Sequence, residues 1–383
     1  MNLTHIPTDC PSNTTDLYLS NNNLEIISKK AFTKYTQLRY PDISDCNVTS
    51  IDKSAFDNLA HLKELSLFDN PMKSFQRNIF VPLDELQVFY ISHDLLSTYP
   101  RESWSDFLNI TKVLSYGGPS NGSFADIFSV MNNLKYLHSD IQIHVLRNCT
   151  FHAFGKTPLK YLEIKGKLMT IEKDTFSPLG CLSSLVIPNA RFLKLSNTLP
   201  ALHVFENRQM DELKFNNNFR VHVIELLFPS TIEILNISCI QIVGNSINSP
   251  TLKGIKDLQE LDLAYSLLFD CNYDLYGLQY VKVLNVSHFK CSLLNHQFLQ
   301  SDVNLEQLIM QSSSLSIELY DDDQSAFHYG LTDRGDVLAG EQTEIPQCVL
   351  QMMSLDGNDH ILKTDRLNEN NIFWKCLDQA MKR

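Results

Sequence analysis

The amino-acid sequence predicts an α/β repeat solenoid in which parallel strands form a concave sheet. Apolar residues recur two positions apart, as in Leu17 and Leu19, and the first residue of the pair returns at positions 17, 41, 65 and 89, which are 24 apart each time. An asparagine or cysteine follows three positions after the second residue of the pair, at Asn22, Cys46 and Asn70. A fixed period of roughly 20–29 residues indicates stacked structural repeats.

Each part of the repeat has a physical reason. Residues two apart in a strand point to the same side, so the paired apolar residues face the interior and the residues between them face outward from the concave sheet. The asparagine turns the chain after the strand and hydrogen-bonds backbone groups that would otherwise be buried without a partner. A phenylalanine that follows an alanine or threonine, as at Phe32, Phe56 and Phe176, is expected to fill the convex side of the core.

The later repeats follow the same pattern less regularly. We expect Leu213 to begin the repeat between positions 185 and 235, with Phe205 as a competing register. The pattern L-x-x-L-x-L-x-x-N/C-x-L identifies a leucine-rich repeat, and about thirteen such repeats of roughly 24 residues predict a horseshoe over residues 16–318. The remaining repeats place their first apolar residue at Val113, Leu137, Leu162, Leu185, Leu235, Leu261, Leu284 and Leu308.

The two ends do not fit the repeat. Residues 1–15 are interpreted as a partial N-terminal cap, and residues 319–383 as a non-repeat C-terminal segment. Three interpretations of that segment stay open: a small cap-like domain, a divergent insertion, or sequence foreign to the parent gene. Because the sequence shows neither an apolar run of 18 residues nor a signal peptide, we expect a fragment of a larger secreted or membrane-anchored protein.

Composition narrows the function. The chain carries 32 Lys and Arg against 44 Asp and Glu, a net charge of −12, which argues against binding nucleic acid over the whole surface and leaves a local basic patch open. Eight N-glycosylation sequons indicate the secretory route. They begin at Asn2, Asn13, Asn47, Asn109, Asn121, Asn148, Asn236 and Asn285.

Cysteines and polar motifs carry little further chemistry. The nine cysteines form no C-x-x-C pair. Cys271 and Cys291 are as readily two buried thiols as a bridge, and a disulfide between Cys149 and Cys181 is also open. The acidic segment at 320–324 suits calcium, but a solvated turn is favoured, and the Arg-Gly-Asp within 333–336 is interpreted as chance.

The outward strand positions are the candidate ligand-binding surface. Catalytic motifs are absent from the sequence, so we expect a binding protein without enzyme activity, cofactor or metal. Tyrosine and histidine supply amphipathic contact area, which interfaces favour. Asn236 and Asn285 also face outward, and glycans there would block that part of the face. The candidate ligand-binding residues are Tyr90, His93, Tyr136, His138, Tyr161 and Lys165.

The opening phrase resembles one known family. Ile6, Pro7, Pro11 and Thr14 match the repeat entry of Toll-like receptors, while Cys10 replaces an apolar residue. Together with the repeat form and the sequons, the chain resembles a Toll-like receptor ectodomain over about residues 1–318, without the transmembrane and TIR parts. The resemblance implies binding of a microbial lipid, protein or nucleic acid, and dimerisation.

Two other classes of protein are weighed beside this one. The first is another extracellular repeat protein, of a matrix-proteoglycan or neuronal-adhesion kind. The second is an inhibitory or enzyme-associated repeat scaffold in the cytosol. Glycan occupancy separates the extracellular classes from the cytosolic class, because only a chain on the secretory route is glycosylated at these sequons.

Overall fold

A computed structural model shows two compact units, residues 1–187 and 188–383, and each unit is described by itself. The predicted boundaries after residues 15 and 318 stay predictions. The structure describes residues 3–188, 190, 192–193, 195–215, 220–221, 225–227, 231–237, 241–242, 251–253, 257–265, 267–268, 281–285, 307–309, 316–320, 326–331, 337–339 and 361–363.

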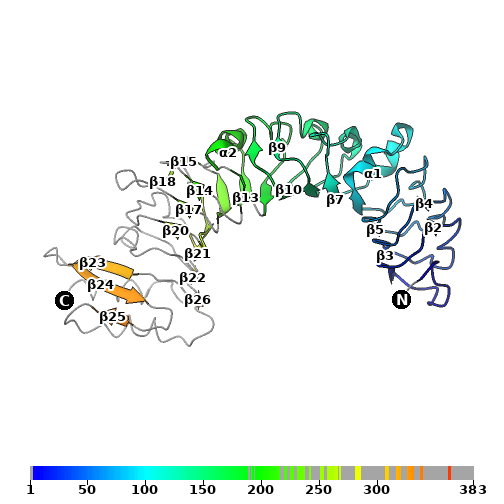
Figure 1. Cartoon of the computed structure of the whole chain (residues 1–383), viewed down its shortest axis with the longest axis horizontal. Coiled ribbons are helices and arrows are strands. Elements are labelled where there is room, and N and C mark those ends of the chain that lie inside the picture. The colour runs from blue at the N-terminus through cyan, green and yellow to red at the C-terminus, as the bar shows by residue number, and fades with distance from the viewer. Residues whose placement is uncertain are drawn as a thin grey trace. The chain divides into compact units, whose positions relative to one another are not determined.

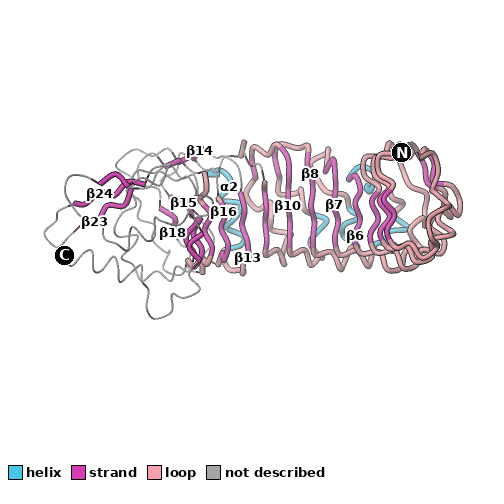
Figure 2. Tube along the Cα trace, turned by 90° about the horizontal axis from the view of Figure 1, so that it is seen from below, coloured by secondary structure: helices cyan, strands magenta, loops and turns pink. Residues whose placement is uncertain are grey.

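In the first unit every repeat contributes one strand to a parallel sheet, and the strands run side by side like rungs (Figure 2). The predicted positions are in register: Leu17 pairs with Pro41, Leu65 with Phe89, Val113 with Leu137, and Leu162 with Leu185. The predicted leucine-rich repeat fold is therefore confirmed. The strands are β1 (Asp16–Tyr18), β3 (Tyr40–Asp42), β5 (Glu64–Ser66), β6 (Val88–Ser92), β7 (Lys112–Gly118), β8 (Tyr136–Ile141), β10 (Tyr161–Gly166) and β12 (Ser184–Ile187).

Short elements form the opposite side of the first unit. The strands β2, β4 and β9 lie on the outer side of the curve that β3, β5, β7 and β10 line (Figure 1). The short strands are β2 (Ile26–Ile27), β4 (Ser50–Ile51), β9 (Val145–Leu146) and β11 (Thr170–Ile171). The helical elements are α1 (His93–Ser97) and three 3-10 helices, η1 (Arg101–Phe107), η2 (Asp126–Val130) and η3 (His152–Phe154).

The core lies between these two sides. The first apolar residue of each strand pair is buried, and so are the phenylalanines of the convex side. Phe32, Phe56 and Phe80 stack with 6.1 Å between successive ring centroids, and Phe124, Phe151 and Phe176 form a second stack at 5.3 and 5.9 Å. Aromatic rings at this spacing add about 0.5–1.5 kcal/mol per pair beyond the area they bury. Stacking between repeats therefore supplies the core that one repeat lacks.

The asparagine position works as predicted. The Asn70 carboxamide oxygen accepts from the backbone N–H groups of Cys46 and Val48, at 3.0 and 2.9 Å. Its nitrogen donates to the carbonyl oxygens of Ile43, Leu67 and Phe68. The side chain thus ties one turn to the preceding repeat, as backbone groups away from water require.

Cys46 occupies the same position one repeat earlier. Its Sγ donates to the carbonyls of Leu19 and Ser44 at 2.9 and 3.3 Å, and burial raises the pKa of the thiol. Cys10, Cys149 and Cys181 are also free thiols. The disulfide weighed between Cys149 and Cys181 is therefore not formed in this structure, whereas Cys271 and Cys291 lie outside the described residues.

The fourth repeat departs from the pattern. Asp94, which lies 24 residues after Asn70, is largely exposed, because the chain forms α1 there instead of the usual turn. Ser92 ends β6 and caps this helix, accepting the backbone N–H of Leu95 at 3.3 Å. The next two repeats carry Ser115 and Ser139 where the second leucine is usual. Among the described residues, their buried hydroxyls have no hydrogen-bond partner.

The second unit continues the repeat. Leu213 pairs with Leu235, Leu235 with Leu261, and Leu284 with Leu308, so Leu213 is the correct register and the competing Phe205 lies in a 3-10 helix. The parallel strands are β13 (Met210–Phe215), β16 (Ile232–Asn236), β19 (Glu260–Asp262), β21 (Val283–Asn285) and β22 (Gln307–Ile309), and β26 (Ile361–Lys363) joins β22 antiparallel.

The remaining elements of the second unit are short. The helices are α2 (Leu195–Leu202) and η4 (His203–Phe205). Side strands are β14 (Arg220–Val221), β15 (Glu225–Leu227), β17 (Gln241–Ile242), β18 (Thr251–Lys253) and β20 (Leu267–Leu268), and β23 (Ser316–Tyr320), β24 (Ala326–Leu331) and β25 (Val337–Ala339) form an antiparallel sheet. No helix in the described ranges is long and apolar enough to cross a membrane.

Candidate functional site

The outward face is the side of the first unit's sheet whose side chains point away from the core. Because Leu65, Phe89 and Leu162 point into the core, their strand neighbours point outward. Residues in register on adjacent strands lie within about 5 Å of each other, so they form continuous rows across the repeats. One such row runs Tyr18, Asp42, Ser66, Tyr90, Leu114, His138, Glu163 and Val186.

Three of the predicted ligand-binding residues contact one carboxylate on this face, and a fourth lies beside them. Glu163 Oε2 lies 2.8 Å from His138 Nδ1 and accepts the Tyr161 hydroxyl at 3.0 Å, while its Oε1 pairs with Lys165 Nζ at 3.0 Å. The rings of Tyr136 and Tyr161 lie 6.2 Å apart. We call these five residues the Glu163 cluster. Glu163 is the member that the list of candidate ligand-binding residues had missed.

Burial and charge pairing set the ionisation of the cluster. Burial lowers the pKa of His138, and the hydrogen bond to Glu163 offsets part of that effect. Burial raises the pKa of Glu163, but its bonds with Lys165, His138 and Tyr161 outweigh burial, so the net shift is downward. A half-buried carboxylate with three partners is rigid and ionised at neutral pH. The cluster therefore presents a fixed set of donors with aromatic rings beside them.

Tyr90 belongs to a different part of the face. Its hydroxyl donates to Glu64 Oε2 at 3.4 Å, and burial, followed by the nearby Glu64, raises its pKa. Two residues beyond the row of Tyr90, Phe68 in the turn after β5 stacks on Tyr116 of β7, with 4.6 Å between ring centroids. This pair was not predicted as a unit, although both residues occupy outward positions with the 24-residue spacing. The strand register would have placed the two side chains on the same face.

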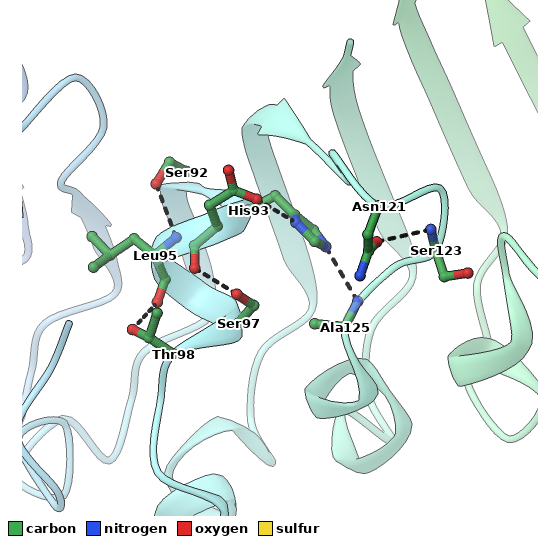
Figure 3. A network of polar contacts seen from close by, with 9 residues as sticks. Ser92, His93, Leu95, Ser97, Thr98, Asn121, Ser123 and Ala125 are labelled. Atoms are coloured by element: carbon green, nitrogen blue, oxygen red, sulfur yellow. Dashed lines mark hydrogen bonds and ion pairs between the residues drawn. The ribbon is translucent and has the colours of Figure 1, made fainter. Parts of the chain in front are cut away.

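His93 is not on the outward face, so its predicted exposure is wrong. Only 3% of the residue is exposed. Its Nε2 accepts the backbone N–H of Ala125 at 3.2 Å (Figure 3). Its ring packs on Phe124 and Phe128, with 5.5 and 6.4 Å between ring centroids. Strand alternation already places position 93 on the inward side with Phe89 and Ile91. His93 is therefore a core residue that joins α1 to the fifth repeat.

The environment of His93 keeps its ring neutral. Burial lowers its pKa, and the hydrogen bond to Asp94 at 3.4 Å only partly offsets this. Because Nε2 accepts a hydrogen bond, it carries no proton in this arrangement. Figure 3 also shows the loop sequon at Asn121, where Asn121 Oδ1 accepts the Ser123 N–H at 3.1 Å.

The sequons of the first unit avoid the outward face. Asn13, Asn47, Asn109, Asn121 and Asn148 are all exposed, and each lies outside the strands of the main sheet. The second unit differs, because Asn236 and Asn285 lie on β16 and β21 in the row of Asp262. Asn236 Nδ2 donates to Asp262 Oδ2 at 2.9 Å. Asn2 lies outside the described residues.

Other motifs add no site. Within the described residues, no group of three His, Cys, Asp or Glu side chains could hold a metal ion. Of the acidic segment only residue 320 is described, and the Arg-Gly-Asp of 333–336 lies outside the described residues.

Two family models match the chain. The model described as "Leucine rich repeat" matches residues 36–96, and the "BspA type Leucine rich repeat region (6 copies)" matches residues 125–221.

Curated relatives match at low identity. Keratocan from Mus musculus is 29% identical over 199 residues, covering 51% of this chain and 52% of keratocan. Tsukushi from Gallus gallus is 27% identical over 277 residues, covering 67% of this chain and 69% of Tsukushi. Toll-like receptor 3 from Boselaphus tragocamelus is 30% identical over 189 residues, covering 44% of this chain and 20% of the receptor. The chain thus spans about half the length of keratocan and a fifth of the receptor.

These matches span several kinds of repeat protein, so they do not single out Toll-like receptors, as the opening phrase had suggested. They agree with the strand register, the buried leucines and the asparagine turns. The chain therefore carries leucine-rich repeats and has the fold that such repeats form.

Proposed function

We propose that this chain is the partner-binding part of an extracellular leucine-rich repeat protein, and that it binds its partner on the outward face of the first unit. It acts by binding rather than by catalysis. One observation carries the proposal: the face combines exposed tyrosines with strands free of sequons, while all five described sequons of the unit lie elsewhere. Glycans at those positions leave the face open and shield the flanks and the convex side.

The physical character of the face supports binding. Tyr136 and Tyr116 are 44% and 36% exposed, although aromatic residues usually gain free energy by burial. Aromatic residues with a polar tip are enriched at protein interfaces. The Glu163 cluster adds oriented donors, so the face offers both apolar area and directional contacts.

A receptor role is the second candidate. The entry phrase around Ile6 and the similarity to Toll-like receptor 3 favour it, and dimerisation and a microbial ligand would belong to that role. Keratocan and Tsukushi align over larger shares of the chain, and they favour the broader extracellular role. A nucleic-acid ligand would need basic side chains such as Lys112, which lies in register with Tyr136, and Lys165, which belongs to the Glu163 cluster.

A glycan placed on the outward face tests the proposal. Tyr90→Asn creates an Asn-Ile-Ser sequon on β6, and Ile26→Asn creates another on the convex strand β2, where Ile26 is 58% exposed. Tyr90→Gln removes the tyrosine without adding a glycan. All chains are secreted from mammalian cells, glycan occupancy is measured by mass spectrometry, and folding is checked by the thermal midpoint.

Binding of the fluorescently labelled chains is then measured on cell surfaces and on cell-deposited matrix. We expect saturable binding of the original chain, loss of binding with the glycan at position 90, and retention with the glycan at position 26. Staining of cells supports the receptor role, and staining of matrix supports the broader role. Equal binding by both glycan variants would show that the outward face is not used, and a chain without glycans would refute the extracellular assignment.

A further inference from the structure

Within the described residues, three carboxylates on the outward face have no basic partner. Asp16, Asp42 and Glu64 lie on the adjacent strands β1, β3 and β5, and none of them forms an ion pair in the part of the chain that the structure describes. Arg39 and Lys63 precede two of these strands but do not pair with them. Later repeats differ, because Glu163 pairs with Lys165 and Glu212 with Lys214 on the same strand.

Tyrosines alternate with these carboxylates. In register, Tyr40 lies beside Asp16, and Tyr18 lies beside Asp42. Tyr18 is 74% exposed, the largest exposure among the large apolar side chains of the described residues. Tyr90 lies on β6, the strand next to β5, and its hydroxyl donates to Glu64. We call Asp16, Tyr18, Tyr40, Asp42, Glu64, Ser66 and Tyr90 the acidic tyrosine patch.

One largely covered serine lies at the floor of the patch. Ser66 occupies an outward position in register with Asp42 and Tyr90, yet it is only 8% exposed. Its hydroxyl makes no hydrogen bond within the described residues, whereas the neighbouring Ser44 hydroxyl donates to Asp42 Oδ1 at 2.6 Å. The Ser66 hydroxyl is thus an acceptor or donor at the floor of the patch.

We propose that the acidic tyrosine patch binds an arginine-bearing segment of a protein partner. The proposal rests on the proposed function, because it names the partner chemistry for one half of the same face. A planar guanidinium stacks flat on tyrosine rings and pairs bidentately with carboxylates, whereas the lysine ammonium is a compact point charge that does neither in this planar way. A calcium ion would require six to eight oxygen ligands, and no metal-binding group is present in the described residues.

The charge of the patch selects against other partners. Three uncompensated carboxylates repel phosphate groups, so the patch excludes nucleic acid from this half of the face. The interaction is also expected to weaken with salt, because exposed charges are screened beyond about 10 Å at 0.1 M ionic strength.

The test uses the secreted full chain and labelled peptides at pH 7. The probe is a fluorescein-labelled peptide with two arginines separated by two glycines, compared with versions that carry lysine or glutamate instead. The first variant combines Asp16→Asn with Glu64→Gln, which keeps side-chain size and removes two charges. Asp42 is left unchanged, because asparagine there would form a sequon with Ser44. The control combines Asp57→Asn with Glu102→Gln, two acids away from the sheet's outward face.

We expect saturable binding of the arginine peptide, weaker binding of the lysine peptide and no binding of the glutamate peptide. The first variant should weaken arginine binding about tenfold, and the control should not change it. Ser66→Ala should also weaken binding without lowering the thermal midpoint.

Three outcomes would overturn the inference. They are the absence of arginine-peptide binding, equal binding of the glutamate peptide, or equal loss in the control variant. If the peptide fails while the glycan at position 90 still blocks surface binding, the partner class is wrong and the proposed function stands. If the peptide binds while that glycan has no effect on surface binding, the proposed function is wrong.

Discussion

Replacing Asn70 with alanine should destabilise the first unit strongly for so small a change. The side chain makes five hydrogen bonds with backbone groups of two successive repeats, at 2.8 to 3.2 Å. Asn70→Ala removes all five at once and leaves the Cys46 and Val48 N–H groups without their acceptor. The turn lies under neighbouring repeats, so water reaches only part of it.

The magnitude follows from these contacts. A backbone group left without a partner away from water costs about 1–3 kcal/mol. Two orphaned N–H groups, with the carbonyls partly rehydrated, therefore give an expected loss of about 2–4 kcal/mol. That is a large share of the roughly 5–15 kcal/mol by which a folded domain is stable. Cys46→Ala should cost less, because a thiol is a weak donor and Cys46 Sγ makes only two contacts.

Urea unfolding and amide hydrogen exchange measure the effect. We expect a lower urea midpoint for Asn70→Ala and faster exchange at the Cys46 and Val48 amides. Asn23→Ala is the control, because Asn23 bonds only with exposed side chains and should change stability by less than about 0.5 kcal/mol. A loss at Asn70 no larger than at Asn23, or unchanged exchange at the two amides, would refute the reasoning.

Three further changes test the core. His93→Gln should keep an acceptor for the Ala125 N–H and remove a titrating group. Because burial lowers the folded-state pKa of His93 below 6.5, the original chain should lose stability as pH falls below that value. Urea unfolding at pH 7.5 and 5.5 should therefore show a smaller loss of stability in the variant. An identical pH dependence would contradict a buried neutral His93. Phe56→Ala should cost about 3–5 kcal/mol because it empties the middle of the phenylalanine stack, and a thermal midpoint within a degree of the original would argue against that packing. Gly166→Ala should lower the secreted yield and the thermal midpoint, because Gly166 has φ 140° and an added Cβ would lie 2.3 Å from the Ile141 carbonyl oxygen; unchanged values would show that the strand can shift.

The spacing of apolar residues predicted the sheet because a repeated strand must keep one face buried. Leu213, chosen over Phe205, pairs with Leu235 as expected. Asn70 likewise bonds the turn, since the backbone there has no other partner. These features depend on local pattern alone, so one sequence is enough to reveal them.

Other features depend on contacts between distant residues. The alternation of side chains along a strand places His93 on the inward side. No local sequence pattern shows that its ring packs on Phe124. The stack of Phe68 on Tyr116 skips one strand, so it follows only once the register is known. Glu163 occupies an outward strand position but was not among the candidate ligand-binding residues, although its three partners make it the centre of the cluster.

The repeat order also sets how the two candidate surfaces can change. The acidic tyrosine patch lies on the first four repeats and the Glu163 cluster on the sixth and seventh, and in this array the hydrogen bonds between repeats run mostly to the immediate neighbour. The free-energy effects of substitutions in one surface should therefore add to the effects of substitutions in the other, as expected for sites with no shared partner. A lineage could thus exchange one specificity while keeping the other, and an engineer could do the same by replacing whole 24-residue modules.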